Sequence, residues 1–132
     1  MLNMFMIIHE FVFDIIVKID PEKSMFISIL SNITQNIDQG EIQGTIEKIN
    51  NKRVFIIETS EINDEIINIG MGFKFYSDTI KKCFKIGCDE FRSSITRNEN
   101  SDKLWKKIFL NYYNVEKHKK YYSVIRPIKS IL

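Results

Sequence analysis

The sequence predicts an α+β fold in which a small antiparallel sheet of three to five strands packs with about three helices. The expected order is β-α-β-β-β-α-α, followed by a last edge strand. Several short segments rich in β-branched and aromatic residues alternate apolar with polar side chains, as half-buried strands do. Three other segments repeat apolar residues at helical spacing after an Asp or Ser. The chain has 132 residues, of which 27% are charged, so we expect residues 1–132 to form a single domain.

The first element covers residues 9–20 and has two interpretations. At a period of two, Phe11, Phe13 and Ile15 share one face, which indicates a strand. Apolar residues in the same segment also align at helical spacing. The β-branched and aromatic content favours the strand. Because charged residues such as Asp14 interrupt the apolar start, we expect neither a signal peptide nor a membrane span.

Residues 21–36 are expected to form the first helix. Asp20 suits the N-cap, and Pro21 suits the first helical position because it has no N–H to lose. Glu22 would lie favourably at the positive end of the helix dipole. An apolar stripe at helical spacing follows, made of Met25, Phe26, Ile29, Leu30 and Ile33. The helix should end before Gly40.

An antiparallel hairpin is expected next. Residues 40–49 place Ile42, Gly44 and Ile46 on one face, and residues 53–60 return as a second strand. The intervening Asn50-Asn51-Lys52 is typical of a tight turn.

The rest of the chain predicts one more strand, two helices and a final edge strand. Phe73 and Phe75 alternate with polar neighbours, so residues 70–77 are expected to be extended, with the nearby glycines marking a bend or bulge. Ser77-Asp78 would cap a second helix that reaches about residue 95. Ser101-Asp102 would cap a third helix with Leu104, Trp105, Ile108, Phe109, Tyr112 and Val115 on its apolar face. Residues 121–132 regain strand character, with Pro127 protecting a sheet edge.

Charge is distributed unevenly along the chain. Residues 1–70 contain eleven acidic and five basic residues, which gives −6, and the remainder carries +8, for a total of +2. The first half is therefore suited to a cationic partner and the last third to an anionic one.

The sequence carries no strong catalytic or metal-binding signature. Its two histidines, His9 and His118, lie in unrelated contexts, and Cys83 and Cys88 lack the usual zinc-ligand spacing. Without a secretory pattern, the two thiols are expected to be reduced, small core residues of a cytoplasmic protein. We therefore expect no enzymatic activity, no cofactor and no metal, although an enzyme whose site is assembled from distant residues is not excluded by sequence.

Acidic residues cluster where the second strand of the hairpin ends. A solvated loop is the simplest interpretation, and a protein-contact patch is the alternative, because the segment lacks the ligand spacing of a calcium loop. The candidate partner-binding residues are Glu47, Glu58, Glu61, Asp64 and Glu65.

The C-terminal third is basic and aromatic, which is compatible with nucleic-acid binding. Trp105 falls on an apolar helical stripe, where core packing explains it better than base stacking does. Lysines on the opposite face are typical of a solvated helix. The candidate nucleic-acid-binding residues in this alternative are Lys106, Lys107, Lys119 and Lys120.

In size, composition and α+β layout, the whole chain resembles the immunity proteins of contact-dependent growth inhibition and related polymorphic toxin systems of bacteria. The resemblance implies a non-catalytic antitoxin that binds and neutralises the toxin domain encoded by the adjacent gene, often a nuclease. It carries no motif, so no functional residue transfers from it. The alternative hypothesis is a small nucleic-acid-binding or phage-defence accessory protein. A second copy of the chain is a further candidate partner, and no membrane is expected to be one.

Overall fold

The computed structural model describes most of the chain, namely residues 2–8, 11–20, 22, 24–63, 71–95, 99–111 and 114–126. Eight strands form one sheet in the order β1-β2-β3-β4-β5-β6-β8-β7. The strands are β1 (Leu2–Ile8), β2 (Phe11–Asp20), β3 (Met25–Asn32), β4 (Ile37–Ile49), β5 (Lys52–Ile62), β6 (Glu90–Arg92), β7 (Val115–Lys117) and β8 (Tyr122–Ile125). The two helices of the described residues are α2 (Met71–Lys85) and α3 (Glu99–Asn111).

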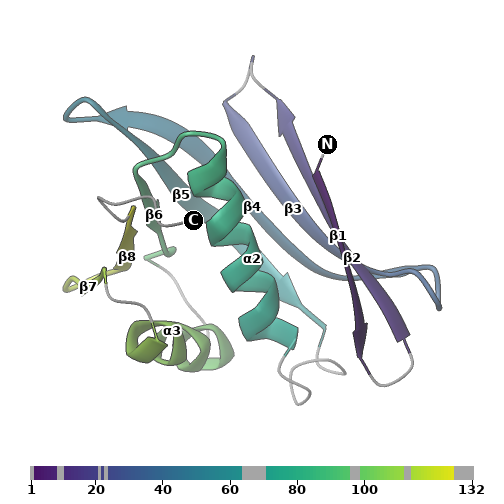
Figure 1. The fold of residues 1–132 in the computed structure, drawn as a ribbon. Helices are drawn as coiled ribbons and strands as arrows, with labels where there is room; N and C mark the ends of the chain where they lie inside the picture. The colour runs from purple at the N-terminus through teal and green to yellow at the C-terminus, as the bar shows by residue number, and fades with distance from the viewer. Residues whose placement is uncertain are drawn as a thin grey trace.

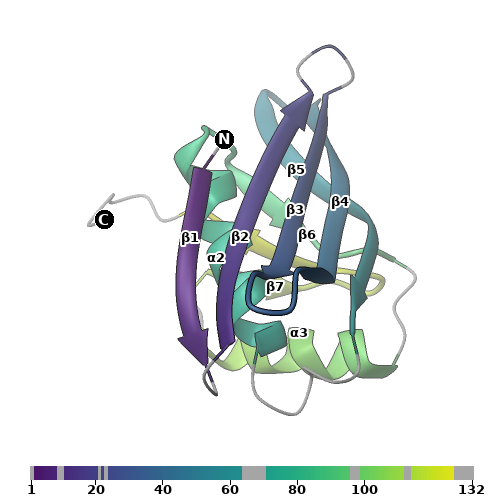
Figure 2. The ribbon, with the colours of Figure 1, turned by 90° about the vertical axis from the view of Figure 1, so that its right-hand side faces the viewer.

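The first five strands form a continuous antiparallel meander. Helix α2 then carries the chain from β5 to β6, and these two strands pair in parallel. Strands β6, β8 and β7 complete the sheet with antiparallel pairing. The sheet curves around α2 (Figure 1), and β1 to β4 lie in front of that helix in the second view (Figure 2).

The hydrophobic core lies between the sheet and the two helices. An aromatic row crosses its centre, with the rings of Phe26 and Phe55 edge to face at 4.8 Å and those of Phe55 and Phe91 stacked at 4.8 Å. Trp105 of α3 extends the row, because its fully buried ring stacks on Tyr122 at 5.7 Å. Such aromatic pairs add specific geometry to the large apolar area that they bury. Together they fix α3 against α2, β6 and β8.

The predicted fold class is wrong in its strand count, its pairing and its helices. The sheet has eight strands rather than three to five, it is mixed because β5 and β6 are parallel, and the described residues contain two helices rather than about three. The interpretation of residues 9–20 as a strand is confirmed by β2, with residues 9 and 10 outside the described part. Strands β1, β6 and β7 are additional to the predicted elements, and β6 lies where the second helix was expected to continue.

The predicted first helix is also wrong, because residues 25–32 form strand β3, which lies between β2 and β4. Side chains alternate along it, so that Phe26 and Leu30 are buried in the core while the β-branched residues between them face the other side. Asp20 does accept a backbone hydrogen bond, from the N–H of Glu22 at 3.1 Å, but this contact closes the turn between β2 and β3. Asp stabilises such turns as readily as helix starts. Pro21 lies outside the described residues.

Two further elements differ from expectation after the hairpin. The strand predicted over residues 70–77 is the first half of α2, with Gly70 outside the described part, so Ser77-Asp78 lies inside the helix and caps nothing. The second helix therefore ends at Lys85 rather than near residue 95. The hairpin itself is confirmed, and Asn50 and Asn51 adopt the positive φ values, 51° and 64°, that its tight turn requires. A third helix is confirmed by α3, but it begins at Glu99, so Ser101-Asp102 lies inside it, and Val115 belongs to β7 rather than to the helix. The final strand is confirmed by β8, although β8 lies between β6 and β7 and is not the sheet edge. Tyr112 and Pro127 lie outside the described residues.

Candidate active site at the fork between β5 and β6

The two parallel strands of the sheet separate soon after they pair. Their contacts run from Val54↔Glu90 to Ile56↔Arg92, after which β5 continues to Ile62 without a described partner on that side. The chain beyond β6 turns instead toward β8, where the N–H of Ser93 donates to the carbonyl oxygen of Tyr122 at 2.9 Å. We call this divergence the β5–β6 fork. Crevices beyond the carboxyl ends of parallel strands are frequent ligand sites in sheets covered by helices.

A β-bulge decides which side chains of β5 reach the fork. Gly44 of β4 opposes Ile57, but the preceding Gln43 opposes Thr59, so Glu58 is an extra residue on β5. The side-chain alternation therefore shifts by one position. Before the bulge, Phe55 and Ile57 face the core; after it, Ser60 and Ile62 do. A Cβ at Gly44 would lie 2.2 Å from the carbonyl oxygen of Ile56, so only glycine fits beside the bulge.

The bulge places Ser60 against a buried tyrosine. The hydroxyl groups of Ser60 on β5 and Tyr76 on α2 are hydrogen-bonded, and Ser101 of α3 is a second hydrogen-bond partner of Tyr76. Burial raises the pKa of the Tyr76 phenol above 10.0, and the two serine contacts oppose this rise only in part. The phenol, 1% exposed, thus stays protonated at neutral pH and holds the Ser60 hydroxyl in place.

A cavity opens next to Ser60, at the end where β5 terminates and β4 begins. Its volume is about 420 Å³, and it is lined by Asp38, Gln39, Gly40, Glu41, Ser60, Glu61, Ile62 and Asn63. Glu41 and Glu61 are direct neighbours across the β4–β5 pair, and Asp38 adds a third carboxylate. No lysine or arginine is among these lining residues. Carboxylates that face one another repel, so this arrangement favours a positively charged ligand.

The first turn of α2 lies beside the end of β5. The Cδ1 atom of Ile62 would be 3.3 Å from a Cβ at Gly72, and Leu104 of α3 lies on the same spot, so the helix start packs closely on both neighbours. The first turn contains no acidic residue, and Lys107 lies 5.0 Å from the ring centre of Phe73. The positive end of the helix dipole and this ammonium group together favour an anion.

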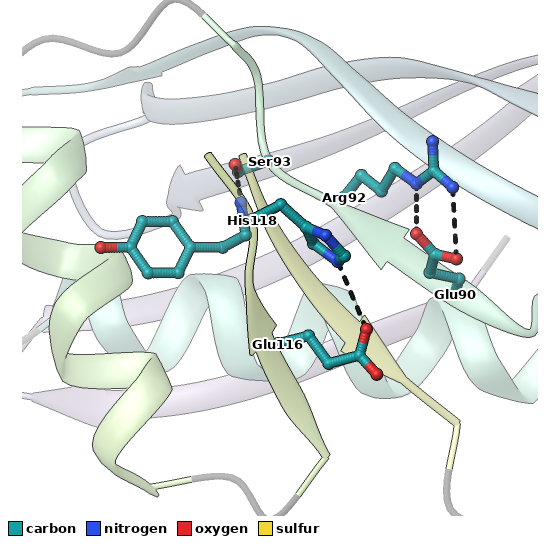
Figure 3. A network of polar contacts seen from close by, with 6 residues as sticks. Glu90, Arg92, Ser93, Glu116 and His118 are labelled. Atoms are coloured by element: carbon teal, nitrogen blue, oxygen red, sulfur yellow. Dashed lines mark hydrogen bonds and ion pairs between the residues drawn. The ribbon is translucent and has the colours of Figure 1, made fainter. Parts of the chain in front are cut away.

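Polar contacts gather around β6 and the β7–β8 hairpin (Figure 3). Arg92, the last paired residue of β6, forms an ion pair with Glu90, and this contact raises the pKa of the guanidinium. The same guanidinium lies 5.0 Å from the ring centre of Tyr121. The Tyr121 ring in turn stacks on the ring of His118, with 4.5 Å between the two ring centres. Nε2 of His118 lies 3.3 Å from a carboxylate oxygen of Glu116. The β7–β8 hairpin is thereby fixed at the end of β6.

The structure separates the residues that were predicted to bind a partner. Glu61 lines the cavity, and Glu58 is the exposed bulge residue. Glu47 opposes Val54 at the other end of the hairpin, and Val54 lies roughly 23 Å from Glu61 along β5. Asp64 and Glu65 lie outside the described residues. Ser60 and Tyr76 were not among the residues predicted from the sequence to form a site, and neither were Asp38 and Glu41. The repeated acidic residues of the β4–β5 segment were the one available signal.

The lysines of the nucleic-acid alternative also lie apart. Lys106 and Lys107 are exposed on α3, where Lys106 pairs with Asp102 at 3.3 Å and Lys107 lies over Phe73. Lys119 and Lys120 are exposed in the turn between β7 and β8. Within the described residues, no group of three His, Cys, Asp or Glu side chains is arranged to hold a metal ion. Neither described helix has the length and apolarity that a membrane crossing needs.

Comparison with known proteins identifies solved structures that share this fold. No protein-family model and no curated protein sequence matches the chain. Among solved structures, a cAMP-binding acyltransferase from Mycobacterium smegmatis superposes with a TM-score of 0.64 at 9% identity, over 98% of this chain and 49% of that one. Glucosamine-6-phosphate N-acetyltransferase from Arabidopsis thaliana superposes with a TM-score of 0.53 at 16% identity, over 74% and 67%. The chain shares its fold with these two proteins. It spans about half the length of the mycobacterial protein.

This finding corrects the functional prediction. The hypothesis of a non-catalytic immunity protein, and with it the alternative of a nucleic-acid-binding or phage-defence accessory protein, is wrong, because the solved structures that share the fold are enzymes that transfer acyl groups. The prediction that the chain is not an enzyme is overturned by the same comparison. At these low identities, the likeness itself concerns the fold alone.

Proposed function

We propose that the chain is an acyltransferase that moves an acyl group from a thioester of coenzyme A to an amine. The observations that carry the proposal lie along the end of β5: its β6-facing edge has no described partner beyond Ile56, Tyr76 positions the Ser60 hydroxyl, and Ser60 and Glu61 line the acidic cavity toward β4. The acyltransferase fold supports it. A cytoplasmic location, where acyl thioesters of coenzyme A are plentiful, is part of the same proposal.

The fork fits the two ends of such a donor. From Ile57 to Ile62, the edge of β5 that faces the fork has no described strand beside it, so its backbone groups are suited to the amides of an extended pantetheine arm. The first turn of α2 and Lys107 provide the positive end that phosphate groups need. When bound, the donor supplies an activated carbonyl group and a thiolate leaving group.

The acidic cavity fits the acceptor. Asp38, Glu41 and Glu61 attract a cationic amine, and a carboxylate among them takes the proton that the amine must lose before its nitrogen can attack. The C–N bond forms as the C–S bond breaks. Ser60 lines the cavity and its hydroxyl donates a hydrogen bond to the departing thiolate, while Tyr76 positions that hydroxyl. The thiolate leaves as a thiol by taking up the proton that the carboxylate removed from the amine. Proton transfer through the carboxylate contributes about 10²–10⁴-fold to a rate.

The first experiment is titration calorimetry with coenzyme A and with acetyl-coenzyme A. We expect both to bind, with weaker affinity when Lys107 is replaced by Gln, and with unchanged affinity for the control Lys106→Gln on the exposed side of α3. No binding of either compound at millimolar concentration would contradict the proposal at its donor step.

The second experiment measures thiol release from acetyl-coenzyme A in the presence of spermidine, glucosamine or lysine. Ser60→Ala should lower kcat at least tenfold while leaving donor binding intact. Thr59→Ala is the matched control, because Thr59 is an exposed hydroxyl residue one position earlier, on the other face of β5. Equal losses in the two variants would remove Ser60 from the mechanism.

A further inference from the structure

Helix α2 ends in a Schellman cap that is defined by two crossed hydrogen bonds. The N–H of Cys88 donates to the carbonyl oxygen of Cys83 at 3.2 Å. Within the loop that this bond closes, the N–H of Gly87 donates to the carbonyl oxygen of Phe84 at 3.1 Å. Gly87 has a φ of 104°, the left-handed conformation that this cap demands and that glycine adopts without strain. The last turn of the helix and the segment that enters β6 are therefore held in one geometry.

This cap brings the only two cysteines of the chain together. The Schellman motif regularly places the side chains of its first and last residues in contact, and here these residues are Cys83 and Cys88. Both thiols are free and 0% exposed, and their side chains are hydrogen-bonded to each other. Two hydrophobic residues usually occupy these positions and pack against each other. Here two thiols make the same contact, and unlike two hydrophobic side chains they can be oxidised to a disulfide.

We propose that Cys83 and Cys88 form a reversible disulfide across the C-terminal cap of α2 when the protein meets a hydroperoxide. The thiolate of one cysteine attacks the peroxide oxygen, which gives a sulfenic acid and releases water or an alcohol. The second thiol then attacks the sulfenic sulfur, the S–S bond forms, and a water molecule leaves. The peroxide is reduced by two electrons, which come from the two thiols.

The surroundings assign the two roles. A hydrogen bond from Cys83, helped by the guanidinium groups of Arg53 and Arg126, lowers the pKa of the Cys88 thiol, whereas the same contact and burial raise the pKa of Cys83. Arg53 lies at the cap itself, since its Nη1 atom would be 3.0 Å from a Cβ at Gly87. Cys88 is therefore the attacking thiol and Cys83 the resolving one.

The disulfide would connect α2 to the segment that enters β6, without reaching the fork. The helix has 15 residues, so its first turn lies roughly 20 Å from the cap. Because both thiols are buried, the oxidant gains access when the last helical turn opens, and helix ends open more readily than helix centres. We expect oxidation to raise the thermal midpoint of unfolding, since it closes a loop in the unfolded chain.

The test is the intact mass of the whole protein after treatment with tert-butyl hydroperoxide, followed by denaturation and alkylation with iodoacetamide. The expected product has lost two hydrogen atoms and takes up no alkyl group, and dithiothreitol restores two alkylation sites. Two alkyl groups after oxidation, stable oxygen adducts or a disulfide-linked dimer would each overturn the proposal. The result does not depend on the proposed acyltransferase activity.

Two variants make the test specific to the cap geometry. Gly87→Ala keeps both thiols but places a side chain on a left-handed residue, so the intramolecular disulfide should form several-fold more slowly. Cys83→Ser removes the resolving thiol, so oxidation should stop at an oxygen adduct on Cys88 that the wild-type protein does not accumulate. A wild-type rate in Gly87→Ala would contradict the dependence on the cap geometry, and no adduct in Cys83→Ser would contradict the assigned roles.

Discussion

The ammonium nitrogen of Lys82 on α2 lies 3.1 Å from the backbone carbonyl oxygen of Ile15 on β2, and donates a hydrogen bond to it beneath the helix. Lys82 is only 5% exposed. Burial lowers its pKa, while the carboxylates of Asp14 and Asp78 act in the opposite direction. The helix that follows the fork is thus docked on the N-terminal half of the sheet by a buried cation with two acidic neighbours.

Replacing Lys82 by Met should destabilise the protein by about 3–5 kcal/mol. The loss of the ammonium group removes a buried cation from beside the carboxylates of Asp14 and Asp78, of which Asp78 keeps only its ion pair with Lys74 at 3.3 Å, and removing one partner of such a buried group costs more than the group itself contributes. Urea unfolding followed by circular dichroism measures this difference. The matched control is Lys81→Met, on the exposed side of the same turn, which should change stability by less than about 0.5 kcal/mol. Similar losses in the two variants would show that Lys82 is not buried with its charge.

Tyr76→Phe should change how stability depends on pH above 10. The folded protein keeps the Tyr76 proton to a higher pH than the unfolded chain, whose tyrosine ionises near 10.0. The free energy of unfolding of the wild-type protein therefore falls as pH rises above 10, and the variant lacks this part of the fall.

Unfolding of both proteins at pH 8 and pH 10.5 provides the measurement. At pH 8, the variant should be less stable by about 1 kcal/mol, because the hydroxyls of Ser60 and Ser101 lose their partner. At pH 10.5, the difference in the free energy of unfolding between the wild-type protein and the variant should be smaller than at pH 8. A gap of constant size would mean that Tyr76 ionises at its ordinary pKa in the folded state.

The hairpin was predictable because its signals are local. Asn50 and Asn51 tolerate the left-handed backbone that a tight turn requires, and the flanking residues alternate in the manner of strands. Strand β3 was not predictable in this way, because its apolar residues fit both the period of two of a strand and the period of about 3.6 of a helix. Phe26, Leu30 and their neighbours make a helical stripe, yet hydrogen bonds to β2 and β4 on both sides stabilise the extended form. That choice is made by tertiary contacts, which the sequence of one segment does not contain.

The candidate site was less accessible to prediction than the fold. Ser60 reaches the helix side of the sheet only because Glu58 is an extra residue relative to β4, and a bulge is a relationship between two strands. Tyr76 was assigned to a strand because Phe73 and Phe75 alternate with polar residues. Its helical neighbours, Thr79 and Ile80, are buried beside it at a spacing that also fits a helix. The acidic character of β4 and β5 was visible in the sequence, but the direct pairing of Glu41 with Glu61 across the two strands was not.

Gly44→Ala should destabilise the protein by about 1–3 kcal/mol, because the new methyl group meets the backbone oxygen of Ile56 at 2.2 Å and a backbone cannot move aside cheaply. Gly72→Ala is the control. Its methyl group would meet only the flexible end of Ile62, at 3.3 Å, and alanine favours the helix, so stability should stay within about 1 kcal/mol of wild type. Thermal unfolding compares the two. If Gly44→Ala were the milder change, the bulge would not need glycine as its neighbour.

Glu41→Gln should stabilise the protein by about 0.5 kcal/mol at low ionic strength, because it removes the repulsion between Glu41 and the directly opposed Glu61. Glu47→Gln on the same strand should act in the other direction, since Glu47 attracts the guanidinium of Arg92. Urea unfolding in dilute buffer and again in 1 M NaCl separates the two cases, and both effects should shrink in salt.

The same variant links stability to the proposed acceptor site. If the cavity binds a cationic amine, Glu41→Gln gains stability and loses acceptor affinity, so KM for the amine rises while affinity for coenzyme A is unchanged. Glu47→Gln, remote from the cavity, should leave KM as it is. A carboxylate that costs stability where it stands and strengthens ligand binding is what a binding site for a cation requires. An unchanged KM in Glu41→Gln would leave the repulsion between the two glutamates without a functional reason and would exclude this cavity as the amine site.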